Sequence, residues 1–134
     1  MHTYASPATP PHSNLGSCKI SCLDADAFNF TGASEVDTVV LDGNSLSALP
    51  EKLLWNMSSL RHFSASANMG LATIPERFFL GQDQLMSIDL RMCTGLAAKP
   101  LPDGLFRGLV NLERFDLMES NVQNLPNLDD LTVR

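Results

Sequence analysis

The chain has 134 residues, of which 44% are apolar and 18% are charged, and this composition predicts one soluble globular domain around a single core. The formal net charge of -6 disfavours nucleic acid as a partner, because phosphate binding needs a basic surface, and it suits a basic or mixed-charge protein better. No stretch is apolar over the roughly 18 to 20 residues that a membrane span requires, so we expect no membrane contact from this segment.

Residues 1–16 contain Pro7, Pro10 and Pro11 among Ser, Thr, Ala and His. They offer almost nothing to bury, and the sequence therefore predicts a flexible tail or linker. They also lack the basic and apolar regions of a secretory signal, so either the signal is left out of this sequence or the protein is not secreted.

A phrase that recurs along the rest of the chain has apolar or small residues at its first, fourth and sixth positions and an apolar-Pro pair further on. In the first three copies, the third and fourth residues after the proline are Leu or Phe, and the tenth is Leu. We divide the chain into copies 36–59, 60–84, 85–111 and 112–127, with a partial copy 128–134. The first, fourth and sixth positions are Val36, Val39, Leu41; Leu60, Phe63, Ala65; Leu85, Ile88, Leu90; and Leu112, Phe115, Leu117.

The ninth position of the phrase holds Asn44, Asn68 and Cys93, and Ser120 in the fourth copy. With this position the phrase reads LxxLxLxxN(or C)xL, and it resembles the leucine-rich repeats of the roughly 24-residue extracellular subtype found in Toll-like receptors, Slit-type proteins and variable lymphocyte receptors. The resemblance implies an α/β solenoid, a right-handed superhelix with a short-stranded parallel sheet on its concave side and an irregular or 3-10 convex side. It also implies that Asn44, Asn68 and Cys93 form a structural ladder that hydrogen-bonds buried carbonyl groups.

Such a solenoid needs a cover over its first core face, and we expect residues 17–35 to form this N-terminal cap with Leu23, Phe28 and Phe30. Cys18 and Cys22 stand where caps of this family place cysteines, and the resemblance implies a disulfide between them. A metal pair is the alternative, but two further ligands are missing nearby.

Two glycosylation sequons begin at Asn29 and Asn56 and agree with an extracellular or cell-surface location. The alternative is a cytoplasmic scaffold or regulatory domain in which Cys18 and Cys22 are reduced.

The sequence contains no recognisable arrangement of catalytic residues. His2 and His12 lie in the predicted tail, and His62 has no second ligand at a metal spacing. Asp24 and Asp26 are better explained as a solvated acidic turn than as calcium ligands. We therefore expect no enzyme, no cofactor and no metal.

The remaining candidate is the concave surface, because side chains between the core positions of each strand point away from the core. The expected function is non-catalytic recognition of a protein ligand, with Asp89, Arg91, Asp116 and Met118 at the centre; for any single residue, a merely solvated sheet face is the alternative. The predicted ligand-binding residues are Asp42, His62, Ser64, Ser66, Asp89, Arg91, Arg114, Asp116 and Met118.

Two further features concern the edges of the repeats. Insertions around Met69-Gly70 and Ala97 to Pro100 lengthen the second and third copies and either decorate the binding side or form tolerated loops. The fourth copy breaks off after Pro126, so we expect a truncated solenoid whose open C-terminal end can self-associate.

Overall fold

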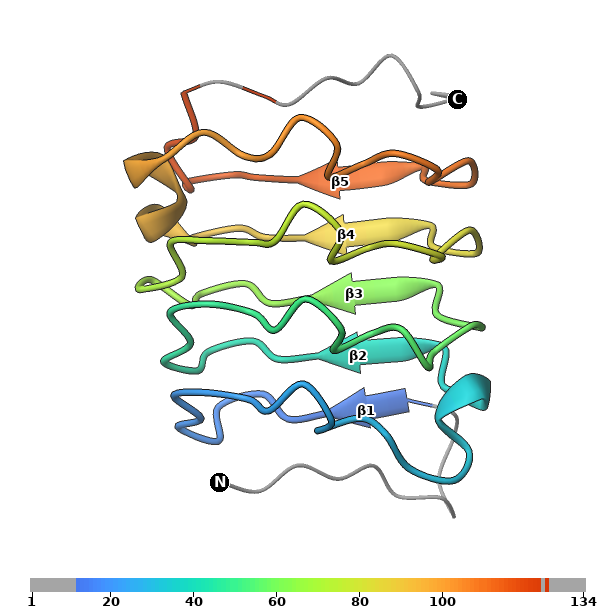
Figure 1. Cartoon of the computed structure of the whole chain (residues 1–134). Coiled ribbons are helices and arrows are strands. Elements are labelled where there is room, and N and C mark those ends of the chain that lie inside the picture. The colour runs from blue at the N-terminus through green and yellow to red at the C-terminus, as the bar shows by residue number, and fades with distance from the viewer. Residues whose placement is uncertain (1–11, 124, 126–134) are drawn as a thin grey trace.

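The computed structural model describes residues 12–123 and 125, which contain five short strands in one parallel sheet (Figure 1). The strands lie side by side in the order of the sequence, and successive windings of the chain are stacked one above another. A parallel sheet with few helices agrees with the α/β class. The strands are β1 (His12–Asn14), β2 (Thr38–Val40), β3 (His62–Ser64), β4 (Ser87–Asp89) and β5 (Arg114–Asp116), and the 3-10 helices are η1 (Ala33–Glu35) and η2 (Thr94–Ala98).

The pairing register aligns the central residues of the strands, and these face the core. Val39, Phe63 and Ile88 are paired in line and are at most 1% exposed, whereas their neighbours on the same strands are half-buried or exposed. Because side chains alternate along a strand, three residues suffice to put one side chain inside and two outside. Phe115 completes the row on β5 and is partly buried.

Strand β1 differs from the predicted flexible tail. His12–Asn14 pairs with β2, and Leu15, which follows it, is buried and donates its N–H to the carbonyl of Val40 at 2.7 Å. The tail prediction is therefore wrong at its C-terminal end, because a strand this short leaves no alternating pattern in the sequence, while the edge of β2 needs a hydrogen-bonding partner. Residues 1–11 lie outside the described part.

The apolar side chains named for the predicted cap lie in the core or against it. Leu23 and Phe28 are buried, and Phe30 is partly buried against them. Ile20 and Ala33 are buried as well, so the covering layer draws on both sides of the acidic turn.

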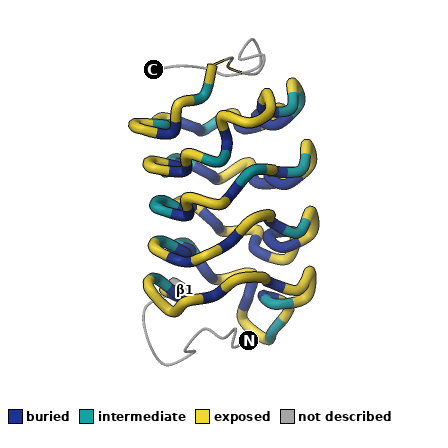
Figure 2. Tube along the Cα trace, turned by 90° about the vertical axis from the view of Figure 1, so that its left-hand side faces the viewer, coloured by how far each residue is buried: buried dark blue, intermediate teal, exposed yellow. Residues whose placement is uncertain are grey.

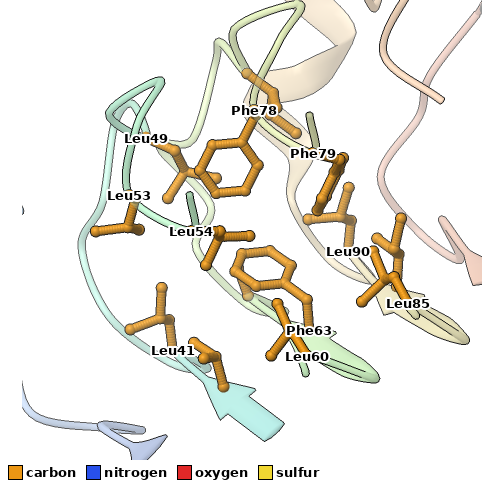
Figure 3. Close-up of a cluster of buried hydrophobic side chains, with 14 of the residues drawn as sticks. Leu41, Leu49, Leu53, Leu54, Leu60, Phe63, Phe78, Phe79, Leu85 and Leu90 are labelled. Carbon is orange, nitrogen blue, oxygen red and sulfur yellow. The ribbon is translucent and has the colours of Figure 1, made fainter. Parts of the chain in front are cut away.

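Leucine and phenylalanine side chains fill the interior between the sheet and the returning segments (Figure 3). Phe63, Phe78 and Phe79 meet edge to face in all three pairings, with ring centroids 4.9 to 5.6 Å apart. Each such pair contributes about 0.5 to 1.5 kcal/mol to stability beyond the contribution of the buried apolar area. Buried stretches recur in each of the stacked windings (Figure 2).

Gln82 occupies a core position where Met57 and Leu109 stand in neighbouring copies. Its side chain is 2% exposed; Nε2 donates to the carbonyl of Leu54 at 2.6 Å, while Oε1 is buried without a hydrogen-bond partner. The Leu54 carbonyl also accepts the N–H of Met57 at 3.0 Å, so it does not depend on Gln82. Gln82 therefore lowers the stability of the fold through its unpaired Oε1.

Replacing Gln82 by methionine should raise the free energy of unfolding by about 1 kcal/mol, since methionine has a similar unbranched shape and leaves no oxygen unpaired. Urea denaturation followed by the fluorescence of Trp55 measures the change. The matched control is Gln84→Met, because Gln84 is exposed and its replacement should leave the midpoint unchanged. A lower midpoint for Gln82→Met would contradict this explanation.

The insertion of the third copy forms η2 at the carboxyl end of the strands (Figure 1). It is not a free loop, because Gly95 donates its N–H to the carbonyl of Met69 at 3.0 Å and Leu96 is buried. Residues 97–100 are exposed beyond that contact.

The predicted partial copy 128–134 lies outside the described residues, and self-association through that end stays a prediction. No helix within residues 12–123 is long and apolar enough to cross a membrane.

Candidate functional site

The side chains of the predicted ladder point inward and hydrogen-bond the backbone of two adjacent windings. Asn44 donates from Nδ2 to the carbonyls of Leu15 and Leu41, at 2.8 and 2.9 Å. Its Oδ1 accepts the N–H groups of Cys18 and Ile20 at 2.9 and 3.0 Å. Each amide therefore satisfies carbonyl and N–H groups that a turn in the chain leaves unpaired.

The same arrangement continues with other residue types. Asn68 donates to the carbonyls of Leu41 and Ala65, and the Cys93 thiol donates to the Ala65 carbonyl at 3.1 Å. In the last winding Ser120 donates its hydroxyl to the Leu90 carbonyl and accepts the N–H of Cys93 at 3.0 Å.

The three cysteines differ in their surroundings. Cys93 is fully buried, and this burial raises the pKa of its thiol above the usual value of 9.0. Cys18 and Cys22 are exposed and free, so the predicted disulfide between them is not formed. The Cys18 thiol instead donates to the carbonyl of Gly16 at 3.3 Å.

In the native protein, Cys18 and Cys22 should react readily with a soluble disulfide reagent near neutral pH, whereas Cys93 should react only after unfolding. Thiolate is the reactive form, and both burial and the raised pKa of Cys93 suppress it. The number of cysteines that react with the reagent, counted with and without denaturant, measures the difference. Rapid native reaction of Cys93, identified by peptide mapping, would show that the ladder is not buried.

The face of the sheet opposite the core, here termed the open face, carries the side chains on either side of each buried central residue. A shallow groove of about 360 Å³ lies on it, across β2, β3 and β4, and it extends to Arg114 of β5. Six of the predicted ligand-binding residues line this groove. Thr38, Val40 and Ser87 line it too, although the predicted set omits them. Their positions beside the core residues of the strands could have identified them from the sequence. The six are Asp42, His62, Ser64, Asp89, Arg91 and Arg114.

The predicted central group is held together by Arg91. Its guanidinium binds Asp89 through both carboxylate oxygens, with the closest contact at 2.9 Å, and lies 3.8 Å from Asp116. The guanidinium of Arg114 lies 3.8 Å from the same oxygen of Asp116, Oδ2. These side chains remain 20% to 73% exposed, so the network fixes the positions of the charges more than it stabilises the fold.

Asp89 is partly buried, which acts to raise the pKa of its carboxyl, but hydrogen bonds from the side chain and backbone of Arg91 and the charges of Arg91 and Arg114 outweigh this. The pKa of Asp89 therefore lies below its usual value of 3.8. Because the folded pKa is the lower one, ionised Asp89 stabilises the fold above that range, and this contribution is lost as the pH falls through the folded pKa. The open face keeps this charge at neutral pH.

Carboxylates of the open face also bind backbone N–H groups just beyond the strands. Asp89 accepts the N–H of Arg91 at 3.1 Å, and Asp116 accepts the N–H of Met118 at 2.9 Å. Asn14 does the same for Gly16 at 3.0 Å. Asp89 and Asp116 therefore have a structural role that the sequence did not predict, and a change at either affects more than surface charge.

The other predicted residues are placed as follows. Ser66 is half-buried and Met118 is 63% exposed, and neither lines the groove. The two sequon residues, Asn29 and Asn56, are exposed, with Asn56 in a turn.

The search for known relatives gives no guide to this surface, since no protein-family model and no curated protein matches the chain. No group of three or more His, Cys, Asp or Glu side chains in the described part of the chain could hold a metal ion.

Proposed function

We propose that this protein is a leucine-rich-repeat protein that recognises a protein partner, without catalysis, through the open face of its sheet. The observation that carries the proposal is the groove across β2, β3 and β4, where charged and polar side chains of these strands and Arg114 of β5 converge opposite the core. The recurring sequence phrase, the strand register and the inward ladder support the family assignment. The proposed architecture is a right-handed solenoid with this face on its concave side.

The character of the groove favours a protein over a small molecule. Small-molecule sites are enclosed and mostly apolar, with a few polar groups that fix orientation. This groove is shallow and lined by ionic side chains such as Asp89, Arg91 and Arg114. Side chains of this kind bring affinity and specificity through complementary charge on a broad surface.

The test uses the protein as bait in extracts of its source tissue and quantifies the bound proteins by mass spectrometry. Arg114 suits the test because its side chain is 73% exposed and its contact with Asp116 is long. We expect Arg114→Glu to reduce binding of the specific partners at least tenfold. The control is Lys99→Glu, a similar charge change at an exposed residue beside η2, which should leave binding unchanged.

Equal capture of all proteins by wild type and Arg114→Glu would overturn the proposal. A test by charge reversal at Asp89 or Asp116 is less clean, because both carboxylates also hold backbone N–H groups.

We propose an extracellular or cell-surface location, supported by the exposure of both sequon residues, Asn29 and Asn56. The free thiols of Cys18 and Cys22 favour the alternative, a protein that works inside the cell. Intact mass of the native protein separates the two. Hexose mass at Asn56, or two hydrogens lost at Cys18 and Cys22, supports the first, and an unmodified chain supports the second.

A further inference from the structure

The three carboxylates at the carboxyl ends of β2, β4 and β5 differ in how their charge is compensated. Asp89 and Asp116 both face Arg91, at 2.9 and 3.8 Å. Asp42, which follows β2 and lines the same groove, has no ion pair with any described residue. Of the acidic side chains that line the groove, Asp42 is the one without an ion pair at contact distance, and the charge of Arg91 acts on it only from farther away.

Contacts from the neighbouring winding hold the Asp42 carboxylate in place. Oδ1 accepts both the hydroxyl of Ser64, at 2.5 Å, and the backbone N–H of Ser66, at 2.9 Å. Both donors use the same oxygen, so Oδ2 has no hydrogen-bond partner among the described residues. A fixed carboxylate with one free oxygen binds a cation without first losing side-chain freedom.

The walls of the groove beside Asp42 suit the stem of a long basic side chain. Val40 lies two residues before Asp42 and lines the groove with an apolar side chain, and Thr38 and His62 line it further along. Lysine and arginine lay their methylene groups along apolar surface while the charged end reaches a polar partner.

We propose that Asp42 is the docking point for a basic side chain, lysine or arginine, of the protein partner. The cation binds at Oδ2, and its stem lies along Val40. This inference rests on the proposed function, because it places one contact of the partner within the open face. It also fits the overall charge of -6, which favours a partner with basic side chains at the contact.

The test is a random peptide library displayed on phage and selected on the folded protein, with the affinities of the selected peptides then measured. We expect one position of these peptides to be enriched in Lys or Arg. Asp42→Asn should weaken their binding at least tenfold, because asparagine keeps an Oδ1 acceptor for Ser64 and Ser66 but loses the charge.

Asp37→Asn is the matched control. Asp37 is also a half-buried acid next to β2 that accepts a hydroxyl hydrogen bond, from Thr38 at 2.9 Å, but it does not line the groove. This variant should bind the peptides as wild type does. Replacing the enriched arginine by citrulline, or the lysine by norleucine, tests the same contact on the unaltered protein, and it also distinguishes the two basic side chains.

Peptides that bind Asp42→Asn as well as wild type, but lose affinity for Arg114→Glu, would overturn the docking point and leave the proposed function standing. Selection without any enriched basic position would overturn it equally. Peptides insensitive to both variants would count against the open face itself. If Asp42→Asn is unfolded by circular dichroism, an undiminished affinity of the citrulline or norleucine peptide for wild type overturns the inference.

Discussion

Replacing Asn68 by alanine should lower the free energy of unfolding by about 2 to 3 kcal/mol. The side chain is fully buried, and its Oδ1 accepts the N–H of Leu46 at 3.2 Å. Alanine leaves that buried N–H without its partner, at a cost of about 1 to 3 kcal/mol. The carbonyls of Leu41 and Ala65 suffer less, because Asn44 and Cys93 still donate to them.

The control for this experiment is Asn56→Ala, which removes the same side chain from an exposed turn and should change stability by less than about 0.5 kcal/mol. Urea denaturation of both variants supplies the comparison. Asn68→Cys should fall between wild type and Asn68→Ala, because a thiol donates to a carbonyl at the equivalent place in the next winding, as Cys93 does. Equal midpoints for Asn68→Ala and Asn56→Ala would mean that the ladder contributes nothing to stability.

Replacing Gly95 by alanine should cost about 2 to 3 kcal/mol and detach η2 from the winding before it. A Cβ atom at Gly95 would lie 2.6 Å from the carbonyl oxygen of Leu71 and 3.0 Å from that of Met69. Both are backbone atoms, so relief requires the chain itself to move, and overpacking of this kind costs about 1 to 3 kcal/mol. The hydrogen bond from Gly95 to Met69 would be strained in addition.

Gly70→Ala is the matched control, because the nearest atom to its added Cβ is the carbonyl oxygen of Leu46, at an ordinary 3.8 Å. We expect this variant to remain within about 0.5 kcal/mol of wild type. Hydrogen exchange of the Gly95 and Leu96 amides would show the local loosening in Gly95→Ala. Wild-type protection there, together with an unchanged urea midpoint, would contradict the close approach of η2.

The apolar interior was largely predictable from the sequence. The fourth-position residues Val39, Phe63 and Ile88 are buried, and so are the polar ninth-position residues Asn44 and Asn68. These positions recur at nearly constant spacing, and a pattern fixed in the chain order predicts burial whatever the detailed path of the backbone.

Three features were not predictable in this way. Strand β1 is too short for any periodicity, and the edge of β2 determines it. Free thiols at Cys18 and Cys22 replace the disulfide that resemblance implied. The hydrogen bond from the N–H of Met118 to the carboxylate of Asp116 depends on the direction of the backbone beyond the strand, which residue types alone do not specify.

The sequence by itself determined which residues lie inside, because the apolar and ninth-position residues carry that information in their order along the chain. Only the tertiary structure decided how the charges of the open face are shared. Arg91 meets Asp116 from the next winding, and Asp42 meets Ser64 and Ser66 of its neighbour. These partners are 22 to 25 residues apart in the chain, and the strand register brings them together. Neighbouring residues in the sequence therefore do not show whether a carboxylate has a hydrogen-bonding or ion-pair partner.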